Sequence, residues 1–272
     1  MEKIKQNAFV KKVGFNRIIL VLVMLVMYLS FGLLTGGKFF GMSRIMDTMN
    51  YVYFLGFLSL GVTFVIATGG IDFSIGPVMF CCALVSGYSF LTHGIPMAAA
   101  LILSVVIGWY RNFVKAGNVP TGLIIFLTAA IICGVVLNKT KAGRYILCLG
   151  SNKEAVRLSG VDVKKWEMLA YVICGILVGI AAIFYVGAYT TVQPGYGDQY
   201  NNEAIAGCVM GGTSMAGGLA SIGGTVIGVL IISLLQQGIL ALGFSKDYQF
   251  IITGIIVIAA VYADVSARRR KN

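Results

Sequence analysis

Asp72 is the acidic residue best placed for chemistry in this 272-residue sequence, because apolar segments lie on both sides of it. It belongs to the segment Thr68-Gly-Gly-Ile-Asp-Phe-Ser-Ile-Gly76. A carboxylate at membrane depth is costly and usually has a function. Asp72 and Ser74 are also suitable N-cap residues, whose side-chain oxygens accept hydrogen bonds from the first N–H groups of a helix. The residues alone allow Asp72 to cap an interrupted helix or to contact a solute.

A second glycine-rich segment, Gly211-Gly-Thr-Ser-Met-Ala-Gly-Gly218, interrupts another apolar run. Paired helix breaks in the two halves of a membrane protein indicate an internal repeat that lines a transport path. Glycine also lets helix backbones approach closely, so tight helix packing produces the same pattern. Spacing alone favours neither interpretation.

The remaining residues do not indicate an enzyme. His93 is the only histidine and lies in a short connection, which leaves no Ser/His/Asp triad. The six cysteines lie mostly in apolar runs without a Cys-x-x-Cys pair, and no Walker sequence for ATP hydrolysis is present. We expect no catalytic residue, no metal and no cofactor. Glu203 is expected at a water-exposed helix start, near the positive end of the helix dipole.

The composition is typical of a polytopic membrane protein. Apolar residues make up 58% and charged residues 11% of the chain, against about 25% charged in soluble domains. The mean hydropathy is +0.89. Spanning segments in lipid are helices or closed barrels, and these runs lack strand alternation. We predict one all-α bundle of about eight spans with discontinuous helices, from candidate segments 18–34, 51–68, 73–90, 96–109, 119–137, 166–189, 204–216, 221–242 and 249–263.

Basic residues indicate how the chain is oriented. The net charge is +11, and 16 of the 21 Lys and Arg residues lie before residue 18, in the loop 138–165 and at 268–271. The positive-inside rule places such patches in the cytoplasm, with the first span uncleaved. We therefore expect both termini and the loop 138–165 inside, with pseudo-halves at about 18–137 and 166–265. Nucleic acid is not an expected partner, because no aromatic residues are interleaved with the charges.

The segment 96–109 conflicts with this orientation if it spans the membrane. Its 14 residues reach about 21 Å as a helix, short of a hydrocarbon core of about 30 Å. Five spans between two cytoplasmic patches would also place the second patch outside. We therefore predict a non-spanning or displaced segment here, with Arg111 and Lys115 near the outer interface.

The loop 138–165 contains a candidate surface helix. Helix-forming residues lie between Asn152, a suitable N-cap, and Gly160, a suitable residue just after a helix end. A two-turn helix at the cytoplasmic surface would suit docking to another protein. A solvated connector with its charges facing water is the alternative.

The two glycine-rich segments and the stretch from Gly143-Arg-Tyr to Val163 resemble the permease subunits of bacterial sugar ABC importers. Ribose, galactose and autoinducer-2 permeases are the most similar in character, and branched-chain amino-acid permeases are more distant. The resemblance covers residues 56–104 and 119–264. It implies a ten-helix inner-membrane protein that pairs with a second permease copy or paralogue, a cytoplasmic ATP-binding subunit and an extracytoplasmic solute-binding protein.

The resemblance also implies roles for particular residues. The ATPase-coupling loop would comprise Gly150, Asn152, Glu154, Ala155, Arg157, Gly160 and Val161. The candidates for the translocation path are Thr68, Gly69, Gly70, Asp72, Ser74, Gly76, Gly211, Gly212, Thr213, Ser214, Gly217 and Gly218.

Two departures from the family pattern bear on whether the chain can transport by itself. About one helix with its loop is missing near residues 110–118, and Asn201-Asn202-Glu203 replaces a stretch of acid–Leu–Asp character. The main expectation is a permease subunit of an ATP-driven importer for a sugar or similar small polar solute. The alternatives are a truncated permease paralogue acting as a scaffold and, more distantly, an ion-coupled carrier.

Overall fold

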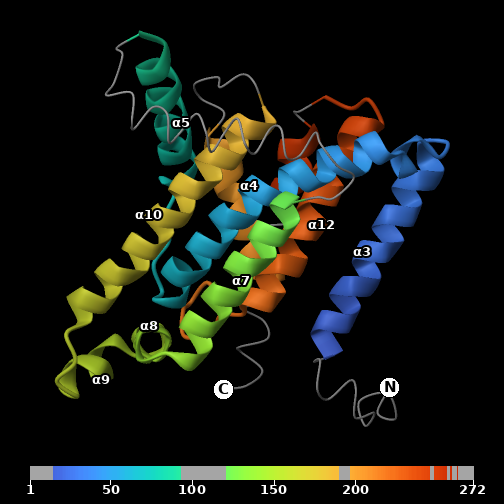
Figure 1. The fold of residues 1–272 in the computed structure, drawn as a ribbon. Coiled ribbons are helices and arrows are strands. Elements are labelled where there is room, and N and C mark those ends of the chain that lie inside the picture. Colours follow the sequence, from blue (N-terminus) through green and yellow to red (C-terminus); the bar gives the residue numbers. More distant parts are fainter. Residues whose placement is uncertain are drawn as a thin grey trace.

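The structure is a computed structural model, which describes residues 15–92, 121–189, 197–245, 248–255, 258 and 262. The described residues form helices and turns without a strand, which confirms the predicted all-α class. Figure 1 shows these helices gathered side by side as a bundle. The predictions for His93, the segment 96–109, Arg111, Lys115 and the stretch 110–118 lie outside the described residues.

Apart from the segment 96–109, the predicted segments correspond to observed helices with shifted ends. In chain order the elements are α3 (Phe15–Leu34), the short 3-10 helix η1 (Lys38–Phe40), α4 (Met42–Ala67), α5 (Ile75–Thr92), α7 (Thr121–Lys139), α8 (Lys141–Ser151), α9 (Lys153–Leu158), α10 (Val163–Ala188), α11 (Gly197–Met210) and α12 (Ile222–Ala241). Residues 248–255 are also helical. Among the described residues, the four helices α4, α7, α10 and α12 are long and apolar enough to cross a membrane.

The predicted boundaries were wrong for two helices. Helix α4 begins before the expected Tyr51, because polar residues such as Arg44 and Asp47, which form an exposed ion pair, continue the helix beyond its apolar part. Helix α11 begins before the expected Ala204 and ends at Met210. It ends there because Gly212 adopts a φ of +90°, a left-handed conformation that stops helices.

The helices of the first half alternate in direction along the bundle (Figure 1). In Figure 1, α8 and α9 lie at the end of the bundle where α7 ends and α10 begins. Helix α5 runs away from this end, and α7 runs back toward it. The end of α5 and the beginning of α7 therefore both face away from α9. The beginning of α3 lies at the same end of the bundle as α9.

Helix α4 is the centre of the bundle. From Tyr51 to Ala67 it is largely apolar around its circumference, and every residue in this part is buried. It contacts α10, α11, α12 and α7, which explains why it needs no polar face. Aromatic rings fill the space beside α10 and α11, where Phe54 packs edge-on against Tyr185 and Tyr200. By contrast, most of α7 is exposed along its apolar side.

Glycines bring α11 and α12 into backbone contact. A Cβ atom added to Gly228 would meet the carbonyl of Gly207, and one added to Gly224 would meet the carbonyl of Gly211. Helix α5 approaches the start of α11 in the same way, through Gly76. Small residues permit such close approach between membrane helices. At Gly76 and Gly211, the observed geometry is that of tight helix packing.

Candidate functional site: a glycine junction and an exposed surface helix

The three sequence motifs meet at one place in the fold. The backbone of Gly150, near the end of α8, lies against Gly217 and Gly218 and against the carbonyl of Ala67, the last residue of α4. The N–H of Gly218 donates a hydrogen bond to that Ala67 carbonyl at 3.0 Å. Gly69 also contacts Gly217. We call Gly69, Gly150, Gly217 and Gly218 the glycine junction.

Positive φ angles explain why glycine occupies three of these four positions. Gly69, Gly217 and Gly218 have φ values of +84°, +80° and +76°. Side chains other than glycine rarely adopt this region, so the two chain reversals depend on these residues. Gly150 is helical, but a Cβ atom on it would overlap the neighbouring backbone. Close approach is therefore the reason for glycine at this fourth position.

The predicted surface helix is confirmed as α9. The Asn152 side chain caps it, because its Oδ1 accepts a hydrogen bond from the N–H of Ala155 at 2.9 Å. Gly160 follows the helix with a φ of +79°, as expected for a residue just after a helix end. No residue of α9 is buried. In Figure 1, α9 projects from the end of the bundle.

The exposed surface of α9 combines charge with an apolar side chain. Glu154 and Arg157 form an ion pair at 2.5 Å, and this hydrogen bond raises the pKa of the Arg157 guanidinium. Leu158 is 77% exposed, although it is apolar. Sequence analysis did not single out Leu158, because one leucine in a polar loop carries no pattern. Single exposed apolar residues are common on protein surfaces, so Leu158 adds accessible apolar area to α9 without identifying a partner.

The first glycine-rich segment makes a break between α4 and α5. Asp72 Oδ1 accepts hydrogen bonds from the N–H and the hydroxyl of Ser74, at 2.8 and 2.6 Å. These bonds hold the turn before α5, which begins at Ile75, and they reach Ser74 and no N–H group of the helix itself. A side chain from another helix also forms hydrogen bonds with the backbone at the start of α5. The N–H of Gly76 donates to Oδ1 of Asn201, on α11, at 2.6 Å, and the Asn201 amide donates to the carbonyl of Phe73.

The second glycine-rich segment connects α11 to α12. Thr213 and Ser214 are buried, whereas Gly212 is exposed. Ser221 caps α12 by accepting a hydrogen bond from the N–H of Gly224 at 3.1 Å. Of the twelve predicted path residues, Gly69, Gly217 and Gly218 belong to the glycine junction. The other nine lie beside it, in turns or in helix contacts, namely Thr68, Gly70, Asp72, Ser74, Gly76, Gly211, Gly212, Thr213 and Ser214.

The prediction for Glu203 was wrong, because its side chain is fully buried. Its carboxylate accepts hydrogen bonds from the Tyr51 hydroxyl at 2.5 Å, from Gln199 at 2.7 Å and from Gln236 at 2.8 Å. Gln236 also donates to Thr253 at 2.9 Å. Neutral donors from α4, α11 and α12 therefore satisfy the acid, and within the described part of the chain no Lys, Arg or His pairs with it.

A sequence signal for this cluster existed. Gln199 and Glu203 are four residues apart, which places them on one face of a helix. Gln236, with Gln237 beside it, lies in the largely apolar run of α12, where an amide needs a partner. Together they indicated a polar contact between α11 and α12, although not which other helix would join it.

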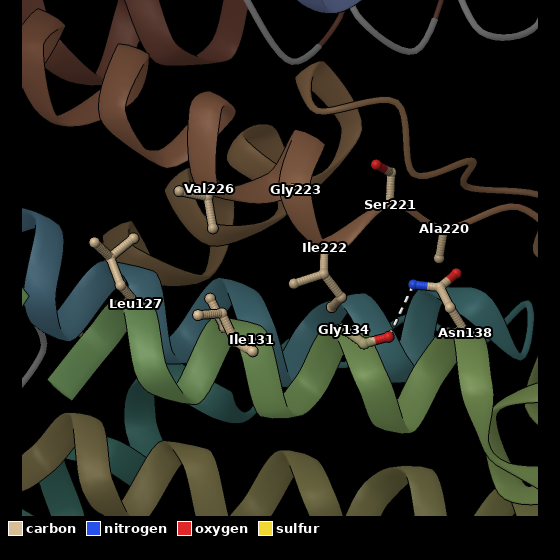
Figure 2. Close-up of a pocket in the computed structure, with 10 residues that line it drawn as sticks. Leu127, Ile131, Gly134, Asn138, Ala220, Ser221, Ile222, Gly223 and Val226 are labelled. Carbon is tan, nitrogen blue, oxygen red and sulfur yellow. Dashed lines mark hydrogen bonds between the residues drawn. The ribbon is translucent and has the colours of Figure 1, made fainter. Parts of the chain in front are cut away.

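A groove of about 490 Å³ lies between α7 and α12 (Figure 2). Leu127, Ile131 and Val226 make its walls apolar, and Asn138 and Ser221 lie toward one end. The Asn138 amide is directed to the carbonyl of Gly134 at 2.9 Å. The predicted path residues do not line this groove.

Long apolar helices with glycine-rich breaks, joined to an exposed polar helix, define the chain as a polytopic membrane protein of permease type. Residues 109–261 match the family described as the permease component of branched-chain amino acid transport systems. The chain belongs to this family.

Several curated proteins are similar to the chain. The ribose import permease of Escherichia coli strain K12 is 34% identical over 201 residues, which cover 74% of this chain and 62% of that protein. The ribose import permease of Bacillus subtilis strain 168 is 31% identical, with 81% and 84% covered. The fructose import permease of Rhizobium meliloti is 24% identical, with 92% and 85% covered. No solved structure matches the chain.

The comparison also bears on the expected missing helix. The match to the B. subtilis protein extends over 273 positions, of which this chain fills about 220, according to its 81% coverage. The relative therefore has about 50 additional residues within the matched region. The coverage gives a difference in length only, and the missing helix near residues 110–118 stays a prediction.

Proposed function

We propose that the chain is the membrane-spanning permease subunit of an ATP-driven importer for a sugar or a similar small polar solute. The observation that carries this proposal is the connection of an exposed, capped helix, α9, to the breaks in the helix bundle through the glycine junction. The ribose and fructose permeases among its relatives support the class of solute.

The proposed partners follow from the two ends of the bundle. A cytoplasmic ATP-binding subunit would dock on α9, through Glu154, Ala155, Arg157 and Leu158, whose side chains are exposed. A solute-binding protein would deliver solute at the opposite end, and a second permease copy or paralogue would complete the path. The basic patches support an orientation with both termini and the loop 138–165 in the cytoplasm of a bacterial inner-membrane protein.

Uptake into vesicles tests the proposal. The chain is purified from its native membrane with the proteins that accompany it, reconstituted, and offered radiolabelled ribose, fructose and xylose together with the solute-binding protein. We expect accumulation that requires ATP and persists when ionophores clamp the ion gradients. Uptake that follows an ion gradient without ATP would instead establish an ion-coupled carrier.

The shorter length of this chain gives the scaffold alternative a specific basis. A scaffold would still bind an ATP-binding subunit through α9, but no solute would enter the vesicles. Binding of the ATP-binding subunit without ATP-dependent uptake of any solute in a broad panel of pentoses and hexoses would therefore contradict the importer and support the scaffold.

We predict that replacing Arg157 by alanine together with Gly160 by valine reduces stimulation of the ATPase by about tenfold. The first change removes the partner of Glu154, and the second places a β-branched residue at a φ of +79°. The measurement is ATPase activity in reconstituted vesicles at equal amounts of inserted permease. The matched control is Lys164→Ala, which removes a basic residue in the first turn of α10, outside α9. Unchanged stimulation in the double variant would count against docking on α9.

A further inference from the structure

We infer that Gly150 is a positioning residue for energy coupling, because it fixes α9 to both interrupted segments of the bundle at once. This inference rests on the proposed function, since it assumes that α9 receives the movement of an ATP-binding subunit. The role that it assigns to the glycine junction is mechanical coupling, and it requires no contact with the solute or with ATP.

The first step is the distance along the chain between the junction and α9. Only Ser151 and Asn152 separate Gly150 from the first residue of α9. Ser151 is the last residue of α8, and Asn152 is held because its N–H donates to the Cys148 carbonyl at 3.0 Å and its side chain caps α9. At the first residue of α9, Lys153 pairs with Glu167 of α10 at 2.5 Å. Helix α9 is thus joined to the end of α8 without a flexible linker.

The second step is the nature of the contacts at Gly150. An added Cβ atom would meet the Ala67 carbonyl, the Gly218 N–H and the Cα atom of Gly217. The two glycine-rich segments are also bonded to each other, through Gly218 and Ala67. Backbone therefore packs on backbone, with no side chain between that could change its rotamer. Close-packed contacts of this kind transmit displacement instead of absorbing it.

The third step is what the two segments control. The segment after Ala67 positions the start of α5, and the segment containing Gly217 and Gly218 positions the start of α12. A displacement of α9 must shift Gly150, and the contacts then oblige both segments to move together. The junction accordingly couples one cytoplasmic helix to the two breaks in the bundle, whose movement opens or closes a path in the proposed transporter.

The test is Gly150→Ala, with Gly175→Ala as its matched control. Both positions are helical, but a Cβ atom at Gly175, in α10, meets nothing within 4 Å. We expect Gly150→Ala to bind the ATP-binding subunit as the unchanged chain does, while ATP-dependent uptake falls about tenfold, as expected for a methyl group forced into a close contact. Gly175→Ala should keep normal uptake. Normal uptake by inserted, ATPase-bound Gly150→Ala would overturn the inference.

A second measurement serves if Gly150→Ala does not fold. Spin labels at Ser159, just after α9, and at Leu219, just after the junction, are placed in a chain whose exposed native cysteines are replaced. Both side chains are exposed. We expect the distance between the labels to stay the same in the nucleotide-free and ATP-bound complex, whereas a change on ATP binding would overturn the inference. The absence of uptake by the unchanged chain would instead refute the proposed function, which separates the two failures.

Discussion

Replacing Glu203 by leucine is expected to remove most of the folded protein from the membrane. The change leaves the hydroxyl of Tyr51 and the amides of Gln199 and Gln236 without their common acceptor, although all three side chains are buried. An unsatisfied buried donor costs about 1–3 kcal/mol, so the sum approaches the total stability of many proteins, about 5–15 kcal/mol. The measurement is the yield of monodisperse protein in detergent and its unfolding temperature.

The matched control is Glu203→Gln, which keeps the length of the side chain and one acceptor oxygen. We expect it to retain a large part of the folded protein, because two of the three donors can still find the amide oxygen. A Glu203→Leu protein as stable as the unchanged chain would show that the carboxylate does not hold α4, α11 and α12 together.

The second large effect is expected at Gly224, where α12 meets α11. A Cβ atom there would overlap the carbonyl and carbonyl carbon of Gly211, and the helices could accept it only by separating. We predict that Gly224→Ala lowers the free energy of unfolding by about 3 kcal/mol, at the upper end of the range for overpacking. Thermal unfolding of the purified protein, with uptake as a parallel measurement, tests this expectation.

Gly223 provides an adjacent control for this experiment. It lies at the groove between α7 and α12, and an added Cβ atom meets nothing within 4 Å (Figure 2). Alanine is the better helix former by about 1 kcal/mol, so Gly223→Ala should be neutral or slightly stabilising. Equal effects of the two substitutions would mean that helix propensity, and not the contact between α11 and α12, explains the result at Gly224.

The sequence determined the features that depend on neighbouring residues. Long apolar runs without alternation predicted helices, because lipid offers backbone groups no other partners. The boundaries of α9 were predictable from Asn152 and Gly160, since capping requires only a side-chain oxygen at one end and a residue that tolerates a positive φ at the other. The three motifs that meet at the glycine junction were also visible as motifs.

Boundaries and burial were less predictable where polar residues occur inside the bundle. The polar stretch Tyr200-Asn-Asn-Glu203 indicated a water-exposed helix start, yet it lies within α11 with Glu203 and Asn201 buried. The reason is that their partners come from elsewhere in the chain. Asn201 accepts a hydrogen bond from the N–H of Gly76 at the start of α5. Glu203 accepts hydrogen bonds from Tyr51 and Gln236, which lie far from it in sequence.

The meeting of Gly69, Gly150, Gly217 and Gly218 was decided only by the tertiary structure. A glycine has no side chain, and this property is equally compatible with a turn, a helix break or a close contact between backbones. Which of these applies depends on the backbone that occupies the space. At Gly150 that space is filled by the end of α4 and the connection before α12, segments that no local pattern relates to α8.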